Sequence, residues 1–365
     1  MIGYILKALV LLVLAWILIK ERRNILVSIL ETKANTTWTV ALLSYVFILL
    51  HYVFVGYSVK AENNLILLFG LFILILNLIL FNWHHTQNIV KATGTVLKYF
   101  SIIFVLFNLM LIFVFPDRTI QGDNYFGPTE NPNMIGAYLS LICYAPILGT
   151  LLVSKGSYSR IFSIILWLSC VYLILMTRSR ASILVVMVIT LYMIWKNVSG
   201  TLFRKIAYLI PVLILGGLAL VLASQKYGDI PILSTREALY VLRLNAISLR
   251  PWLGWGFNAE VFTYFDQNSI YPAMEKGNTT LQFMEEFGIP IGVGLIFILY
   301  YQIFSSAARY SSYDGGLVLG GILLGCGIHL QFETWLLNFP SIFANVFWLL
   351  LLTPVRNSVS GETNE

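Results

Sequence analysis

Two arginines, Arg178 and Arg180, stand at the only polar point of a long apolar run over residues 161–195. A guanidinium group donates paired hydrogen bonds that match the oxygens of a phosphate or pyrophosphate. A cation at the edge of an apolar segment is costly, so it serves a function more often than not. The pair therefore predicts an anion site, although the same side chains could instead extend to the phosphates of membrane lipids.

Three further arginines, Arg236, Arg243 and Arg250, recur at intervals of seven residues. Seven residues make two turns of an α-helix less about 20°, so the three guanidinium groups are expected on one stripe of a helix. One interpretation is a row of cations that binds phosphate or pyrophosphate. The other is an amphipathic helix that rests on lipid head groups, and the spacing does not separate the two.

Two neighbouring segments carry groups that could bind a sugar or move a proton. Gly254 and Gly256 lie in an aromatic-rich turn over residues 251–258, where glycine permits close approach of the backbone. The aromatic rings could stack on sugars or anchor at a membrane surface. Farther on, Asn278 precedes Glu286, whose carboxylate could assist a general base. The alternative is that the acids here only begin the next helix, whose first turn favours negative charge.

The elements that must position these groups are membrane helices. Of the 365 residues, 58% are hydrophobic and only 11% are charged, whereas a soluble domain carries about 25% charged residues. This composition excludes a soluble fold, a disordered chain and a disulfide-stapled secreted module. The three cysteines lie inside apolar runs and predict neither disulfides nor a metal site. We expect one all-α polytopic integral membrane domain over residues 1–365.

Eleven apolar stretches (ten to twelve, given soft boundaries) are candidate transmembrane helices. They lie near residues 2–19, 38–57, 65–82, 99–115, 134–153, 161–176, 181–195, 206–223, 287–304, 315–330 and 337–352. A single helix over residues 161–195 would be about 52 Å long at 1.5 Å per residue, too long for one crossing of a roughly 30 Å core. The run is therefore expected to fold back at Arg178 and Arg180.

The distribution of lysine and arginine predicts the orientation. With alternating sides, thirteen of these residues fall in one set of short segments, and two, Lys60 and Arg118, fall in the short loops of the other set, apart from the hairpin tip with Arg178 and Arg180. The richer set is placed in the cytoplasm. The tail over residues 354–365 is then cytoplasmic, whereas the hairpin tip and the long segment over residues 224–286 face outward. That long loop is expected to contain short helices.

Four stretches, in order along residues 127–304, resemble the O-antigen polymerase and ligase family, which comprises Wzy-type polymerases and WaaL-type ligases. They are Gly127 to Gly136 with its Asn-Pro-Asn-x-x-Gly pattern, Ser179-Arg180-Ala181, Arg236 followed by Pro251-x-x-Gly254-x-Gly256, and Asn278-x-x-Leu281-Gln282 followed by Glu286-x-Gly288. The chain departs from the family at Gly277, where many members, ligases especially, carry histidine. The alternatives are that His329, Asp266, Glu275 or Glu286 takes its place, or that the reaction needs no strong base. The departure favours a polymerase over a ligase.

The resemblance implies a membrane glycosyltransferase that joins polyprenyl-pyrophosphate-linked oligosaccharide repeat units into a surface polysaccharide. Its place would be the outer face of a bacterial cytoplasmic membrane, among membrane lipids. Arg180 and Arg236 would hold the leaving pyrophosphate, and His329 would assist the acceptor. Further substrate contacts would come from Arg178, Arg243, Arg250, Gly254, Gly256, Asn278 and Glu286. No cofactor, metal or nucleic acid is required, and a chain-length regulator and a flippase are the expected protein partners.

Three other functions remain open from the sequence. A ligase would transfer the finished glycan to lipid A-core or to a protein, and only the acceptor distinguishes it from a polymerase. A flippase or other transporter of lipid-linked oligosaccharide usually shows internal repeats and interrupted helices at mid-membrane, and no convincing repeat is visible here. A non-enzymatic scaffold of a polysaccharide assembly complex is the third.

Overall fold

The computed structural model describes most of the chain from residue 86 onward and a few residues before it. The described residues are 43–48, 50–51, 70, 86–122, 124–129, 131–154, 156–197, 201–224, 234–257, 277–313, 315–336 and 342–352. The expected spans at 2–19, 38–57 and 65–82 lie wholly or largely outside these residues. So do Asp266, Glu275 and the tail over residues 354–365.

The described chain is predominantly helical, with one small hairpin. Its first part contains α4 (Thr86–Val114), α5 (Pro116–Thr119), β1 (Ile120–Gln121), β2 (Asn124–Tyr125), the 3-10 turn η1 (Gly127–Thr129), α6 (Pro132–Ala137), the π-helix η2 (Tyr138–Tyr144) and α7 (Ala145–Val153). Strands β1 and β2 pair antiparallel, with Ile120 opposite Tyr125. Its second part contains α8 (Ser157–Thr177), α9 (Arg180–Asn197), α10 (Leu202–Ser224), α11 (Ser234–Leu249), α13 (Thr279–Phe287), α14 (Ile289–Tyr310), α15 (Gly316–His329) and α16 (Ile342–Leu352).

Six helices among the described residues are long and apolar enough to cross a membrane. They are Val90–Val114, Pro132–Val153, Ser157–Thr177, Arg180–Asn197, Leu202–Val221 and Ile289–Tyr310. Each coincides with a predicted apolar stretch, which fits a multi-pass membrane protein. The stretches expected at 315–330 and 337–352 form the shorter helices α15 and α16, of 14 and 11 residues.

The apolar run over residues 161–195 forms two helices with a break between them, as its length predicts. Helix α8 ends at Thr177, and α9 begins at Arg180. Arg178 between them adopts the left-handed conformation, with φ 52° and ψ 24°. A left-handed residue at this position ends a helix and redirects the chain. The sequence therefore located the turn correctly.

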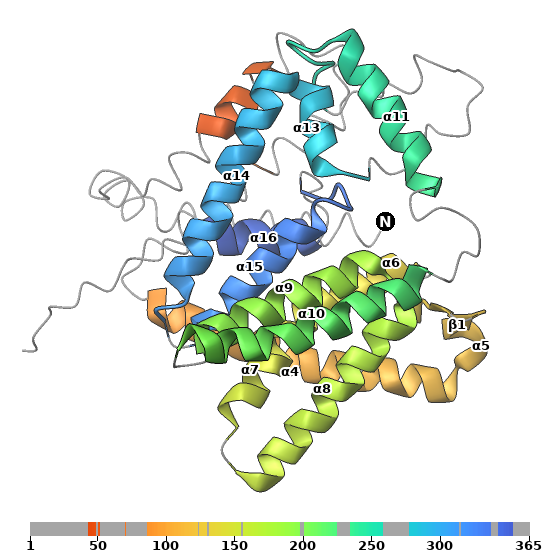
Figure 1. Cartoon of the computed structure of the whole chain (residues 1–365), viewed down its shortest axis with the longest axis vertical. Helices are drawn as coiled ribbons and strands as arrows, with labels where there is room; N and C mark the ends of the chain where they lie inside the picture. Colours follow the sequence, from red (N-terminus) through yellow and green to blue (C-terminus); the bar gives the residue numbers. More distant parts are fainter. Residues whose placement is uncertain are drawn as a thin grey trace, which may run out of the picture.

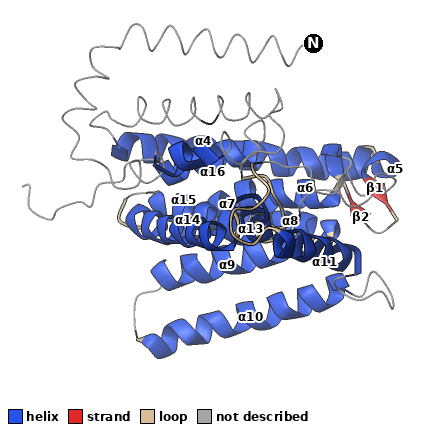
Figure 2. Cartoon of the chain, turned by 90° about the horizontal axis from the view of Figure 1, so that it is seen from above, coloured by secondary structure: helices blue, strands red, loops and turns tan. Residues whose placement is uncertain are grey.

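The long helices form successive layers (Figure 2). Helix α9 packs against α15 and against α10, and α10 lies outermost, with none of its apolar window buried. Helix α14 packs on α15 and α13, and α13 in turn packs on α11. The buried core runs through α4, η2, α7, α8, α9 and α15. Exposed apolar rows on the outer helices are what membrane lipid would cover.

A π-helical segment, η2, interrupts the second described span. Pro146 follows it and has no N–H to donate, so a carbonyl in the preceding turn lacks its usual partner. The Ser101 hydroxyl on α4 donates to the Ile142 carbonyl at 3.2 Å. This contact ties α4 to η2 and fixes the helix that leads from the Asn-Pro-Asn segment into the core.

Candidate functional site

The Asn-Pro-Asn segment packs directly on the turn between α8 and α9. A Cβ atom at Gly136 would lie 2.5 Å from Ser182 Oγ and 3.0 Å from Thr177 Oγ1. Only glycine fits without displacing those hydroxyl groups. Two motifs about 45 residues apart in sequence are therefore joined at one point, which we call the arginine turn (residues 177–182).

Hydroxyl groups hold the backbone of the arginine turn. Thr177 Oγ1 donates to the Ile174 carbonyl at 2.7 Å and accepts from the Ser179 N–H at 3.2 Å. Ser179 Oγ accepts from the Ser182 N–H at 3.4 Å, as an N-capping residue of α9 does. The three hydroxyl-bearing side chains Thr177, Ser179 and Ser182 are buried, whereas Arg178 and Arg180 are half-buried.

Arg178 is the only non-glycine residue with positive φ among the described residues. The left-handed region costs a non-glycine residue roughly 1–2 kcal/mol, and glycine or asparagine usually takes this place at a helix end. Backbone strain of this kind gathers at functional sites. The observation supports the prediction that the arginine turn is functional, and it singles out Arg178 as well as Arg180.

Asn131 orients the chain that enters α6. Its side-chain oxygen accepts hydrogen bonds from the N–H groups of Asn133 at 2.9 Å and Met134 at 3.4 Å, and Pro132 occupies the first helical turn. Proline suits this position because its missing N–H would have no helical partner there. The asparagine therefore explains how the segment starts its helix and brings Gly136 to the arginine turn.

The turn over residues 251–257, here called the glycine turn, pairs with the end of α13. The Trp255 and Gly256 N–H groups donate to the Glu285 and Glu286 carbonyls, both at 2.9 Å. A Cβ at Gly254, whose φ is +66°, would lie 2.5 Å from the Glu286 backbone carbon and oxygen. Gly254 and Gly256, predicted to bind substrate, thus have a clear structural role in a backbone-to-backbone contact.

Arg243 lies inside the protein and not on an exposed row. Its side chain is 0% exposed and forms an ion pair with Glu285 of α13. Burial lowers the pKa of Arg243, and the Glu285 and Glu286 carboxylates oppose that shift. The interpretation of the three arginines as one row that binds phosphate therefore fails at its middle member, because Glu285 draws the guanidinium into the α11–α13 contact.

The other two arginines of α11 have different positions. Arg250 is half-buried, and its guanidinium carbon lies 4.5 Å from the centre of the Trp255 ring, a cation–π contact. The Trp255 indole N–H donates to the Ala246 carbonyl at 2.8 Å, so the ring is fixed against α11. The backbone of Arg236 lies in the first turns of α11, and its side chain is outside the described residues.

The acids of α13 lie at its C-terminal end. The interpretation that they occupy the first turn of the next helix is wrong, because Glu285 and Glu286 precede Gly288 and α14 begins at Ile289. Both side chains are buried, and the Gln282 amide donates to Glu286 Oε1 at 2.8 Å. Glu286 therefore belongs to a buried polar group that holds α11, α13 and the glycine turn together.

Asn278 places the start of α13 beside the end of α15. Its side-chain oxygen accepts from the Leu281 N–H at 2.9 Å, while its amide donates to the Gln331 carbonyl at 2.9 Å. The Thr279 N–H donates to the Leu330 carbonyl at 3.0 Å. The structure thus brings the segment after His329 to the position of Gly277, where the related family often carries histidine.

The hydrogen bond to His329 defines its chemistry. The Trp335 indole N–H donates to His329 Nδ1 at 2.9 Å. An indole N–H only donates, so Nδ1 carries the lone pair and the neutral ring holds its proton on Nε2. In this tautomer His329 is a hydrogen-bond donor at Nε2, which is the opposite of the general base expected from the sequence.

The site therefore consists of two contact regions with different partners. Figure 1 places α6, which packs on the arginine turn, and α11 on the same right-hand side of the molecule. The sequence did not indicate the Arg243–Glu285 pair or the Trp335–His329 bond, since neither follows a helical spacing. In the part of the chain that the structure describes, no three His, Cys, Asp or Glu residues gather as a metal site would require.

Comparisons with known proteins give no independent assignment. No protein-family model matches the chain. No curated protein matches its sequence. The resemblance to O-antigen polymerases and ligases rests on the four sequence motifs.

Proposed function

We propose that the protein is a membrane glycosyltransferase that polymerises polyprenyl-pyrophosphate-linked oligosaccharide repeat units at the outer face of a bacterial cytoplasmic membrane. The observation that carries the proposal is the pairwise contact of the four motifs. Gly136 meets Ser182 and Thr177, and Gly254 meets Glu286. Motifs that share a site are expected to touch, whereas scattered sequence coincidences are not.

The proposed reaction needs no external energy source. A sugar hydroxyl of the acceptor attacks the anomeric carbon of the donor and forms a new glycosidic bond. The bond between that carbon and the pyrophosphate oxygen breaks, and the electron pair leaves with polyprenyl pyrophosphate. The hydroxyl proton passes to a base or to the released pyrophosphate, so the donor itself supplies the driving force.

The arginines supply the positive charge that this leaving group requires. Arg180 begins α9, half-buried beside the strained residue Arg178. Arg236 begins the helix that Arg243 fastens to α13. A preorganised cation acts most strongly where charge develops in the transition state. We assign the leaving-group role to Arg180 and Arg236, and we assign Arg243 to holding α11 in place.

The proton acceptor is reassigned. With its proton on Nε2, His329 suits donation of a hydrogen bond to a sugar or phosphate oxygen, and we propose this role for it. Glu286 is the described carboxylate of the motif set that remains as a base. Pyrophosphate is a good leaving group, so a strong base is not essential to the proposal.

The deciding experiment is replacement of Arg180 and Arg236 by alanine, one at a time. Loss of one charge-assisted contact to a developing anion lowers a rate by roughly 100- to 1,000-fold. Cells should therefore accumulate single repeat units and little polymer, and lysine should restore activity only in part because it lacks the paired donors. Polymer length and amount are measured at equal protein level.

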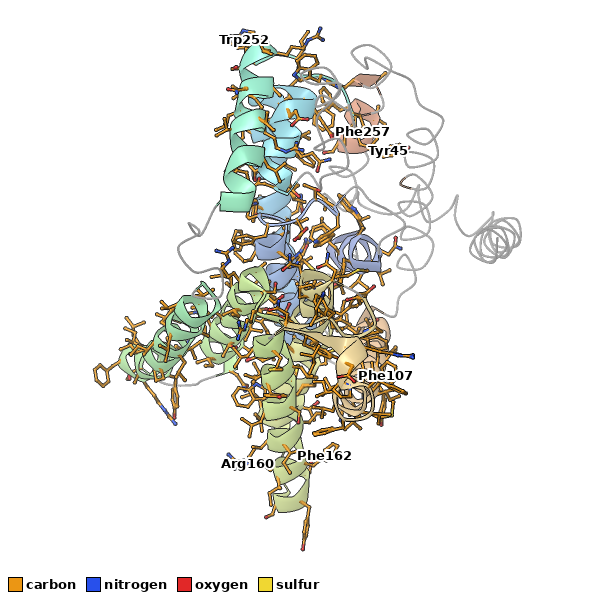
Figure 3. The ribbon with its side chains drawn as sticks, turned by 90° about the vertical axis from the view of Figure 1, so that its right-hand side faces the viewer. Tyr45, Phe107, Arg160, Phe162, Trp252 and Phe257 are labelled. Atoms are coloured by element: carbon orange, nitrogen blue, oxygen red, sulfur yellow. The ribbon has the colours of Figure 1, made fainter. Side chains whose placement is uncertain are left out.

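Arg160→Ala is the matched control, because Arg160 is an exposed arginine near the opposite end of α8 (Figure 3). It should polymerise normally. Normal long-chain polymer from both the Arg180 and Arg236 variants would overturn the proposed site. Flux of lipid-linked repeats across proteoliposomes without chain growth would indicate a transporter, and transfer of finished glycan to lipid A-core or a protein would indicate a ligase.

A further inference from the structure

Over residues 239–249, the part of α11 whose side chains the structure describes, the outward face has no charged side chain. Val241, Leu244 and Leu249 on this face are exposed by 51%, 54% and 58%. Asn245 and Ser248 are the polar residues between them. The charged residue of this stretch, Arg243, points inward to Glu285. A helix outside the membrane normally turns its charges to water, so this orientation is the reverse of a solvated surface helix.

The apolar surface continues from α11 into the glycine turn. Trp252 and Leu253 are exposed by 74% and 59%. Figure 3 shows Trp252 at the extreme end of the molecule, whereas Phe257 from the same turn lies farther inside. Phe257 is only 4% exposed. The turn therefore directs one aromatic residue inward and a second outward.

The glycine turn meets the first residue of an exposed row on α14. Val293, Phe297 and Tyr301 form this row at intervals of four residues, with exposures of 50%, 73% and 62%. The row begins at Ile289, whose N–H donates to the Pro251 carbonyl at 2.7 Å. At 1.5 Å per residue, a span of this length crosses roughly one hydrocarbon core. Ile289 is then at the boundary of the core, and Trp252 lies beside it.

Trp252, beside Ile289, then lies at the level where the hydrocarbon core meets the head groups. Tryptophan is enriched at this level because its ring is apolar and its N–H is polar. The exposed side chains and the contact with α14 thus agree.

We propose that α11 and the glycine turn form an interfacial element. The outward face, made of Val241, Leu244, Leu249, Trp252 and Leu253, lies in the boundary between lipid head groups and acyl chains, level with Ile289. Lipid is the occupant because the glycine turn adjoins, at Ile289, the exposed apolar row of α14, a helix long and apolar enough to cross a membrane. The inward face carries Arg243 and fastens the element to α13. The contact with lipid would thereby fix the distance of α11, and of Arg236 in its first turn, from the hydrocarbon core.

The test uses spin labels on the full chain in lipid nanodiscs. Cysteine is introduced singly at Leu244 and Trp252, with Phe297→Cys as the lipid reference and Gln121→Cys, at the exposed β1–β2 hairpin, as the water reference. The natural cysteines described in the structure are buried, and the parent chain treated with label serves as the blank. Collision rates with oxygen and with a water-soluble nickel chelate are then measured.

Labels at positions 244 and 252 should collide with oxygen several-fold more, and with nickel several-fold less, than the label at position 121. Their depth should be shallower than that of position 297. Collision rates equal to those at position 121 would show a water-exposed face and overturn the proposal. Immobile labels that neither reagent reaches would show a protein partner on this face. So would a label spectrum broadened by the spin label of a second copy. Either result would overturn the proposal. Neither result depends on polymerase activity.

Discussion

The arginine turn and the glycine turn are built in opposite ways. In the arginine turn, Gly136 approaches side-chain hydroxyls, the backbone strain falls on Arg178, and the two cations are half-buried. In the glycine turn, Gly254 approaches the backbone of Glu286, and a fully buried cation is neutralised nearby. The first arrangement leaves its two cations half-buried, whereas the second buries its cation in an ion pair between α11 and α13. Arginines that resemble each other in sequence therefore have different surroundings.

The largest expected difference concerns the two glycines. Gly254→Ala places a Cβ against backbone atoms at a residue with φ +66°, so no side-chain movement relieves it. We expect a loss above about 4 kcal/mol, which would leave little folded protein. Gly136→Ala meets the Ser182 hydroxyl and should cost about 1–3 kcal/mol. The yield of monodisperse protein and its thermal midpoint in detergent measure both.

A second substitution added to each glycine variant tests which atoms block the new Cβ. Ser182→Ala removes the atom nearest the new Cβ of Gly136→Ala and should restore part of its stability. Glu286→Ala leaves the blocking carbonyl in place and should not rescue Gly254→Ala. A Gly254→Ala variant as stable as the natural chain would contradict the backbone contact.

The next largest loss of stability is expected at the buried ion pair between Arg243 and Glu285. Glu285→Gln leaves the Arg243 guanidinium buried beside a neutral amide, and breaking such a pair costs about 3–5 kcal/mol. Combining it with Arg243→Met removes the buried charge as well and should recover much of that loss. Thermal unfolding of the single and double variants gives the coupling between the two residues.

Asp117→Asn is the control for that series, since Asp117 is an exposed acid on α5. It should change stability by less than about 0.5 kcal/mol. A Glu285→Gln variant that behaves like Asp117→Asn would show that Arg243 does not depend on Glu285.

The smallest effect concerns strain at the arginine turn. Arg178→Gly relieves the left-handed conformation and should raise the free energy of unfolding by up to about 1 kcal/mol. Polymer yield should fall nevertheless, because the guanidinium is lost. Arg178→Ala should lower the yield similarly without the gain in stability. Full polymerisation by the glycine variant would remove Arg178 from the site and leave its strain unexplained.

The sequence could predict the features that depend on neighbouring residues. Apolar run length located the six long helices, and the polar interruption of residues 161–195 located the turn at Arg178. The seven-residue spacing correctly placed Arg243 on a helix. It could not tell which neighbour that helix face would meet, so it missed the burial of Arg243. His329 was identified by type, whereas its tautomer depends on Trp335.

What the sequence by itself determined is the positions of the long apolar helices in the described part of the chain and the residue types that could take part in chemistry, because hydrophobicity and helical length act locally along the chain. Only the tertiary structure decided that Arg243 pairs with Glu285, that Gly254 packs on Glu286, and that the end of α15 meets Asn278. Each of these contacts joins residues at least 32 positions apart. Helical periodicity assigns a residue to a face, and only the packing of helices determines whether that face meets a carboxylate, a backbone or lipid.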